Sequence, residues 1–140
     1  MDEELYQEHI LDHYKHPRCK KVLKTYSFSN HDLNPLCGDT LTFYVLVGEN
    51  RVIEQIGFEG KGCAISQACA SIVGEYLQSR SVEELEQLNP QKVLGLLGIT
   101  ISHTRMKCAM LALNVLQKGY NEYSAQDQKL SGKQSEVMIS

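Results

Sequence analysis

The stretch TLTFYVLVGENRVIEQIGF, residues 40–58, decides the fold of this 140-residue chain. Residues 40–47 are rich in β-branched and aromatic side chains, a composition typical of a strand. Gly48-Glu49-Asn50 predicts a hairpin turn, and residues 51–58 supply the returning strand. The centre of the chain is therefore predicted to be an antiparallel hairpin.

Helical patterns follow the hairpin and also precede it. Further elements are expected as helices over residues 3–14 (ended by Pro17), 64–78, 81–89 (from a Ser81/Glu84 capping box), 91–97 and 104–123, and as a short strand within Thr25–Ser29. Antiparallel strands followed by a run of helices indicate an α+β fold. The prediction is a small antiparallel sheet of about three strands packed against a layer of helices.

The length bounds the domain organisation. A chain of 140 residues is long enough for one hydrophobic core and too short for two. Residues 124–140 are polar, so we expect a single domain over 1–123 and a disordered tail over 124–140.

Charge and composition exclude several functional classes. The net charge of −3 gives no electrostatic argument for nucleic-acid binding, and no apolar run approaches membrane-spanning length. The acidic N-terminus lacks a signal-peptide core, so we expect a cytoplasmic protein with reduced thiols. Five cysteines are an odd number, which favours metal binding or catalysis over disulfides.

Three short motifs place a cysteine beside glycines or near the start of a helix. They are NPLCGD (34–39), GKGCAIS (60–66) and RMKCA (105–109), and they contain Cys37 with Asp39, Cys63 and Cys108. A helix N-terminus stabilises a thiolate, which is the form that binds metals and attacks sulfur. Three thiolates and one carboxylate would suit zinc or iron. Because oxygen is a weaker partner than a fourth thiolate in iron–sulfur chemistry, such a site is expected to release its contents readily.

Other residues offer simpler interpretations. Cys69 lies on the apolar stripe of its helix and is expected to pack as a small hydrophobe, while Cys19 is expected to be an exposed bystander. His9, His13 and His16 have near-helical spacing that suits a metal or, more often, an exposed helix face. No paired C-x-x-C is present, so an ordinary zinc-finger signal is missing.

Four segments in order resemble the IscU/SufU/NifU family of iron–sulfur cluster assembly scaffolds. They are the N-terminal stretch from Tyr6 to Arg18 and the three cysteine motifs, with GKGCAIS extended to Ser71, and the resemblance covers about Leu5 to Tyr120. It implies that Cys37, Cys63 and Cys108 are the assembly cysteines and that Asp39 tunes release. It further implies a transient [2Fe-2S] cluster, or zinc or iron at the same site. The implied partners are a cysteine desulfurase, an iron donor and apo-protein cluster acceptors.

Features of two subfamilies occur together. Lys107 precedes the third cysteine, as in SufU-type members, where IscU-type members carry histidine. The 44 residues between Cys63 and Cys108 match the compact IscU-type length. The proline-containing motif with which IscU-type members engage a dedicated Hsp70 chaperone is absent, which argues against that partner.

Two functions follow from these observations, and a third is weaker. The first is a scaffold in which Cys108 first accepts sulfur, supported by Lys107, whose alternative role is that of a solvated helix lysine. The second is a zinc-dependent sulfurtransferase that accepts persulfide sulfur without building a cluster. The third is a structural zinc module, which the glycine-lined loops argue against because structural sites are usually closed.

Overall fold

A computed structural model describes the backbone of residues 2–36 and 38–139, and the side chains of residues 8–36 and 38–126. Its elements, in chain order, are α1 (Asp2–Lys15), β1 (Phe28–Asn34), β2 (Asp39–Val47), the 3-10 turn η1 (Glu49–Arg51), β3 (Ile53–Lys61), α2 (Ala64–Leu77), α3 (Glu84–Gln87), α4 (Pro90–Leu97), the 3-10 turn η2 (His103–Arg105) and α5 (Met106–Ile139).

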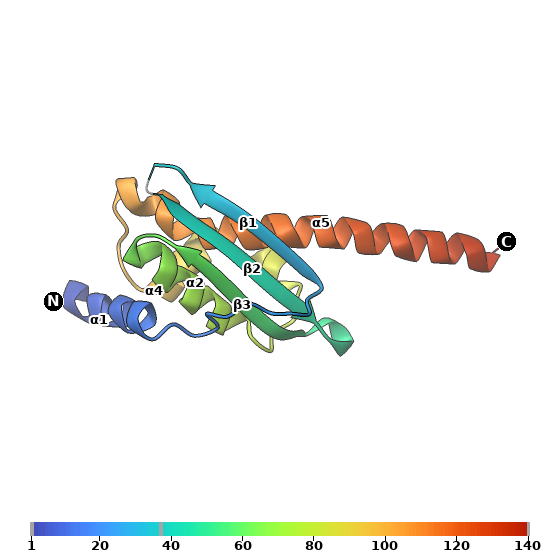
Figure 1. Ribbon diagram of the computed structural model, residues 1–140, viewed down its shortest axis with the longest axis horizontal. Helices are drawn as coiled ribbons and strands as arrows, with labels where there is room; N and C mark the ends of the chain where they lie inside the picture. Colours follow the sequence, from blue (N-terminus) through green and yellow to red (C-terminus); the bar gives the residue numbers. More distant parts are fainter. Residues whose placement is uncertain (1, 37, 140) are drawn as a thin grey trace.

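The sheet is antiparallel, with the strand order β1-β2-β3 (Figure 1). Side chains of β2 alternate as expected for a strand with one covered face: Leu41, Phe43 and Val45 are buried, and the residues between them are partly exposed. Helices α2 and α5 lie against the sheet, and α1 lies against α2. This arrangement confirms the predicted α+β fold and its three-stranded sheet.

The strand β1 differs most from its prediction. It runs from Phe28 to Asn34 rather than within 25–29, and it pairs with β2 from Phe28 opposite Val45 to Asn34 opposite Asp39. Its centre is polar, so propensity gives a weak signal there. The partner strand supplies the hydrogen bonds that the composition does not predict.

Two helix boundaries also differ from the expectation. Ser81 does not cap α3: the helix begins at Glu84, and the Ser81 hydroxyl contacts the carboxylate of Glu83. Helix α5 continues to Ile139, beyond the end predicted near Tyr123. The division into a domain over 1–123 and a tail over 124–140 stays a prediction.

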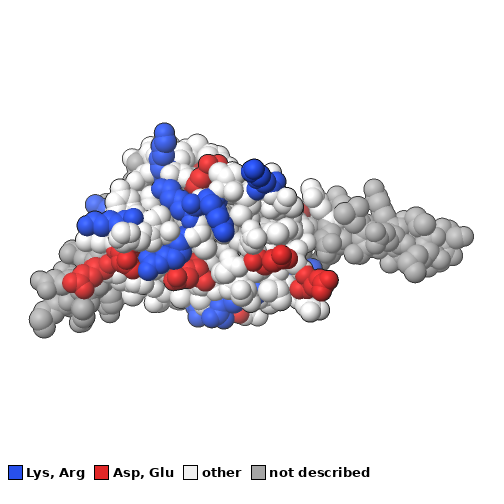
Figure 2. All heavy atoms as spheres, turned by 60° about the horizontal axis from the view of Figure 1, so that its bottom comes forward, with Lys and Arg blue, Asp and Glu red and all other residues white. Residues whose placement is uncertain are grey.

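The surface carries charges of both signs. Figure 2 shows Lys and Arg side chains gathered over part of one face, with Asp and Glu side chains beside them. Arg18 illustrates the mixture, because its guanidinium lies 2.8 Å from Asp12 and 3.7 Å from Glu75. Among the described residues, no helix is both long and apolar enough to cross a membrane.

Candidate metal centre

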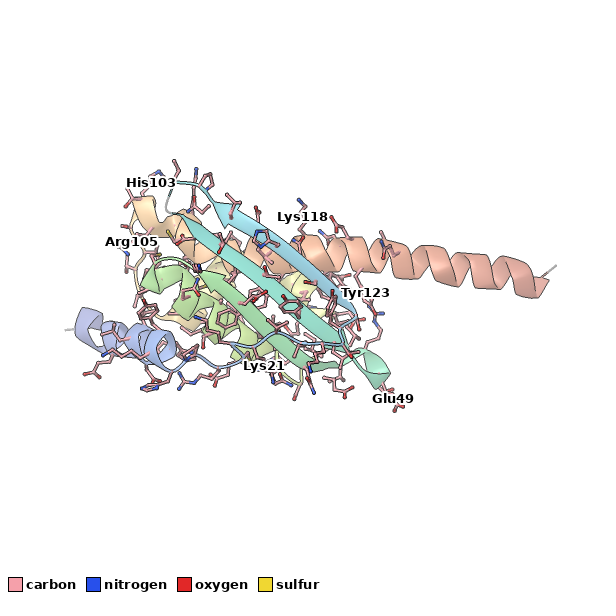
Figure 3. All side chains as sticks on the ribbon, viewed as in Figure 1. Lys21, Glu49, His103, Arg105, Lys118 and Tyr123 are labelled. Carbon is pink, nitrogen blue, oxygen red and sulfur yellow. The ribbon has the colours of Figure 1, made fainter. Side chains whose placement is uncertain are left out.

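Three of the four predicted ligands meet at one point. Asp39, Cys63 and Cys108 each offer a donor atom, and these atoms all lie within 4.8 Å of one another. They come from three different elements: the first residue of β2, the residue before α2 and the first turn of α5. Figure 3 labels His103 and Arg105, which precede α5 at this end of the molecule. These three donors could hold a metal ion, and the full ligand set with Cys37 stays a prediction.

Asp39 is the most enclosed of the three donors. It is completely buried, and its Oδ1 accepts a hydrogen bond from the Cys63 backbone N–H at 2.8 Å. Gly62 makes this approach possible, because a Cβ there would lie 2.1 Å from Asp39 Oδ1 and 2.9 Å from its Cα. The second carboxylate oxygen, Oδ2, remains directed toward the Cys63 sulfur at 4.0 Å.

Cys63 caps the N-terminus of α2. Its Sγ accepts a hydrogen bond from the Ser66 backbone N–H at 3.5 Å, and Ser66 Oγ donates to the Cys63 carbonyl at 3.1 Å. The helix end places partial positive charge beside the sulfur. Cys63 is also partly exposed, so an incoming group can reach it.

Cys108 lies deeper than Cys63, with 2 % of its surface exposed. It is the third residue of α5, so it too lies at the positive end of a helix. The Asn34 side-chain amide points to it, with Nδ2 at 3.8 Å from Sγ. This contact joins residues 74 positions apart, so the local sequence around Asn34 does not predict it.

Cys37, the fourth predicted ligand, lies outside the described residues. Its chain neighbours belong to the loop that joins β1 to β2, and the Gly38 N–H donates to the Asn34 carbonyl at 2.9 Å. Gly38 has φ of +71°, a left-handed conformation that glycine adopts without strain. The role of Cys37 as a ligand therefore stays a prediction.

Lys107 is exposed beside the buried Cys108. It lines a groove of about 360 Å³ together with the apolar residues Leu33, Leu36 and Met106. Leu36 is 77 % exposed, so this rim is open to solvent. The supporting role suggested for Lys107 at the sulfur stays a prediction.

The remaining described cysteines have no place in this cluster. Cys69 is fully buried in α2, its thiol donates to the Ala109 carbonyl at 3.0 Å, and burial raises its pKa to about 12. These contacts agree with the packing role predicted for it. Cys19 is half-buried rather than exposed, and burial raises the pKa of its thiol as well.

The N-terminal histidines do not form a shared exposed face. His13 is buried, and its Nδ1 lies 2.8 Å from Ser71 Oγ in α2. His9 and His16 are exposed, and the His9 ring packs edge-on against His13. The interpretation of His13 as part of an exposed face is therefore wrong, because the contact with α2 was not visible in helical spacing.

The donor set fits a borderline-soft cation. Two sulfurs and one carboxylate oxygen suit zinc or iron, and neither calcium nor magnesium selects sulfur ligands. Three described donors leave at least one coordination position for Cys37 or an external group.

Comparison with known proteins gives one consistent result. The family model of the NifU-like N terminal domain matches residues 5–130. The zinc-dependent sulfurtransferase SufU of Bacillus subtilis is 30% identical over 132 residues, covering 82% of this chain and 88% of that protein. The iron-sulfur cluster assembly scaffold protein IscU 1 of Archaeoglobus fulgidus is 29% identical over 126 residues, covering 90% and 81%.

A solved structure shows the same fold. The crystal structure of a nitrogen-fixing NifU-like protein (N-terminal) from Brucella abortus superposes with a TM-score of 0.72 at 16% identity, covering 87% of this chain and 96% of that one. The family match spans most of the chain and includes all the predicted ligand motifs. The chain therefore belongs to the NifU-like N-terminal domain family, the iron–sulfur cluster assembly scaffold family that includes IscU and SufU.

Proposed function

We propose that this protein is a scaffold on which a [2Fe-2S] cluster is assembled transiently and then passed to apo-proteins. The observation that carries the proposal is the convergence of Asp39, Cys63 and Cys108 within 4.8 Å, with one oxygen among the donors. Iron and sulfide are the cargo of this site. Cys37, Cys63 and Cys108 hold them, and Asp39 or an external ligand completes the set.

Sulfur arrives as a persulfide on a cysteine desulfurase. The Cys108 thiolate attacks the outer sulfur, a new S–S bond forms to Cys108, and the desulfurase cysteine leaves as its thiolate. This transfer involves no net oxidation. Conversion of the transferred sulfur to sulfide takes two electrons from an external reductant. The helix N-terminus at Cys108 supports the attacking thiolate, and Lys107 is the proposed side-chain support.

Asp39 is proposed to make the cargo removable. A carboxylate oxygen binds iron–sulfur clusters less strongly than a thiolate, so a site with Asp39 holds its cluster less firmly than four cysteines would. Asp39 also accepts the Cys63 N–H, which keeps the carboxylate aimed at the sulfurs while the site is filled and emptied.

A second function is favoured by the similarity to SufU. In this alternative the protein is a zinc-dependent sulfurtransferase that takes persulfide sulfur from the desulfurase and builds no cluster. The same residues would hold zinc, which would order the site and keep a bound thiolate available for exchange. Lys107, in the place of the histidine found in IscU-type chains, also supports this alternative.

Metal and sulfide analysis of protein purified without oxygen separates the two functions. The scaffold predicts iron and acid-labile sulfide in equal amounts, a visible chromophore on reconstitution, and transfer of the cluster to an apo-ferredoxin. The sulfurtransferase predicts tight zinc, faster desulfurase turnover and no cluster transfer. Measurements are made in parallel on Cys37→Ser, Cys63→Ser and Cys108→Ser, with Cys69→Ser as the matched control.

The outcomes discriminate clearly. If all three ligand variants keep a normal chromophore and normal zinc content, both functions are wrong. If Asp39→Ala unfolds the protein, and removal of zinc from the native protein unfolds it too, the structural zinc module gains support. Cytoplasmic localisation, the desulfurase, the iron donor and the recipients are parts of this proposal. Binding assays with purified partners test the last three, and cell fractionation tests the first.

A further inference from the structure

Two asparagines on β1 donate their side-chain amides to α5. Asn30 Nδ2 donates to the backbone carbonyl of Val115 at 3.0 Å, and Asn34 Nδ2 points to the Cys108 sulfur at 3.8 Å. The residues lie four positions apart on the same strand and reach the same helix. The acceptor for Asn30 is a backbone carbonyl, whereas the acceptor for Asn34 is the sulfur of a candidate metal ligand.

Asn34 makes two further contacts with the loop that follows it. Its backbone carbonyl accepts the Gly38 N–H at 2.9 Å, and its side-chain Oδ1 accepts the Leu36 N–H at 3.3 Å. Asparagine commonly organises a turn through this side-chain contact two residues ahead. With 7 % of its surface exposed, Asn34 is held between the loop and α5.

We propose that Asn34 is a positioning residue of the metal centre, a role that rests on the proposed function. Its oxygen orders the loop that carries Cys37, and its amide N–H orients and polarises the sulfur of Cys108. One side chain thereby joins the first ligand loop to the third ligand.

The physical basis is the effect of a hydrogen bond on a thiolate. An N–H donor fixes the direction of the sulfur lone pairs and withdraws electron density from them. Hydrogen bonds to ligating sulfurs are among the factors that set the properties of metal–thiolate centres. Cys63 receives its N–H from the backbone of Ser66, at 3.5 Å, so that donor survives side-chain substitution. The amide that Asn34 donates to Cys108 belongs to a side chain, so substitution can remove it.

Three substitutions separate the effect of the Asn34 amide on Cys108 from the effect of the Asn34 oxygen on the loop. Asn34→Asp and Asn34→Ser both keep an oxygen that can accept the Leu36 N–H, and both remove the amide donor to Cys108. The aspartate adds a charge and the serine does not, so an effect common to both reports the lost donor. Asn30→Ser is the matched control, because it removes a similar amide contact between β1 and α5 away from the ligands.

Zinc affinity and the spectrum of the cobalt(II)-loaded protein are the readouts, with zinc and cobalt added as the metals alone. We expect both Asn34 variants to bind zinc about 10-fold more weakly, the lower end of the effect of removing a partner of a metal ligand. The sulfur-to-cobalt charge-transfer band should move to longer wavelength, because a thiolate without its N–H donor is more electron-rich. Asn30→Ser should leave the zinc affinity and the band unchanged.

Each result has a defined meaning. If the Asn34 variants bind zinc and give a cobalt band like the native protein, Asn34 does not position Cys108. If they unfold in urea far earlier than Asn30→Ser and bind no metal, its role is structural and the proposal is overturned. If the native protein itself binds neither zinc nor cobalt, the metal-centre function fails first, and that outcome is visible before any variant is made.

Discussion

The start and the middle of α2 place the same side chain in opposite chemical situations. Cys63, at the start, is partly exposed and its sulfur accepts an N–H from the first turn of the helix. Cys69, two turns later, is fully buried and its thiol donates to a carbonyl of α5. The difference teaches that position along one helix, rather than residue type, decides whether a cysteine sulfur is open to solvent or enclosed in the core.

The largest expected difference between the two positions is in thiol reactivity. Burial raises the pKa of Cys69 from an ordinary 9.0 to about 12, so its thiolate fraction near pH 8 is roughly 1000-fold below that of an ordinary cysteine. Brief alkylation of the metal-free folded protein, followed by peptide mass spectrometry, should label Cys63 and leave Cys69 unmodified. In denaturant both should react alike. Equal labelling in the folded state would remove the distinction between the two ends of the helix.

Substitution at the two positions should affect metal binding unequally. Cys63→Ser removes a ligand, and if four ligands share the binding free energy of a typical structural zinc site, zinc affinity should fall by about 100-fold or more. Cys69→Ser keeps a donor for the Ala109 carbonyl and should leave zinc affinity near the native value. Competition with a chromophoric chelator measures both. A comparable loss in Cys69→Ser would place that buried sulfur in the site after all.

A single added methyl group at Gly62 should disturb the contact between Asp39 at the start of β2 and the residues that lead into α2. Gly62→Ala would place Cβ against the carboxylate and backbone of Asp39, so zinc affinity should drop about 10-fold and the free energy of unfolding by about 1–3 kcal/mol. Gly95→Ala in α4 meets no heavy atom within 4 Å and should stabilise the protein by about 0.5–1 kcal/mol. Urea unfolding and chelator competition test the pair. A destabilising Gly95→Ala would show that alanine substitution itself, rather than contact with Asp39, is the cause.

The smallest expected effect is the pH dependence of stability that comes from His13, which contacts Ser71 in the middle of α2. Burial, and then the nearby Arg18 cation, lower the pKa of His13 below its ordinary 6.5. The unfolded chain therefore takes up a proton near pH 6.5 that the folded chain binds only at lower pH, so stability falls as pH decreases through about 6.5. The loss stops growing below the folded pKa.

His13→Gln isolates this contribution from the other titrating groups. The free energy of unfolding, measured in urea from pH 7 to pH 5, should fall less steeply in the variant than in the native protein. His16→Gln is the matched control, because His16 is exposed just beyond the same helix. An identical pH dependence in the native protein and His13→Gln would exclude protonation of His13 as a source of acid sensitivity.

Much of the fold could be predicted because its strongest signals are local. Composition located β2 and an apolar stripe located α2, and the glycines around Cys63 correctly marked the passage from strand to helix. Polar β1 was placed too early because its pairing with β2 is a long-range interaction. The continuation of α5 was missed because a polar composition after Tyr123 resembles a tail whether or not it is helical.

In the candidate site, too, features with a local signal could be predicted and features that depend on long-range contacts could not. The meeting of Asp39, Cys63 and Cys108 could be anticipated because each motif carries its own glycine or helix start. The contact of Asn34 could not be predicted, because the residues next to it in the sequence do not show that its amide faces a sulfur on α5. His13 was misplaced for a similar reason: its partner Ser71 is 58 positions away. Residues that support a site are harder to find than residues that form it.

The origin of the three donors has a mechanical consequence. The sheet supplies Asp39, α2 supplies Cys63 and α5 supplies Cys108, so an ion held by all three acts as a cross-link between the layers of the core. By thermodynamic linkage, a filled domain resists opening more than an empty one, and anything that loosens the layers weakens the grip on the ion. If the protein is the scaffold proposed above, a recipient that binds the loosened form would favour release of the contents.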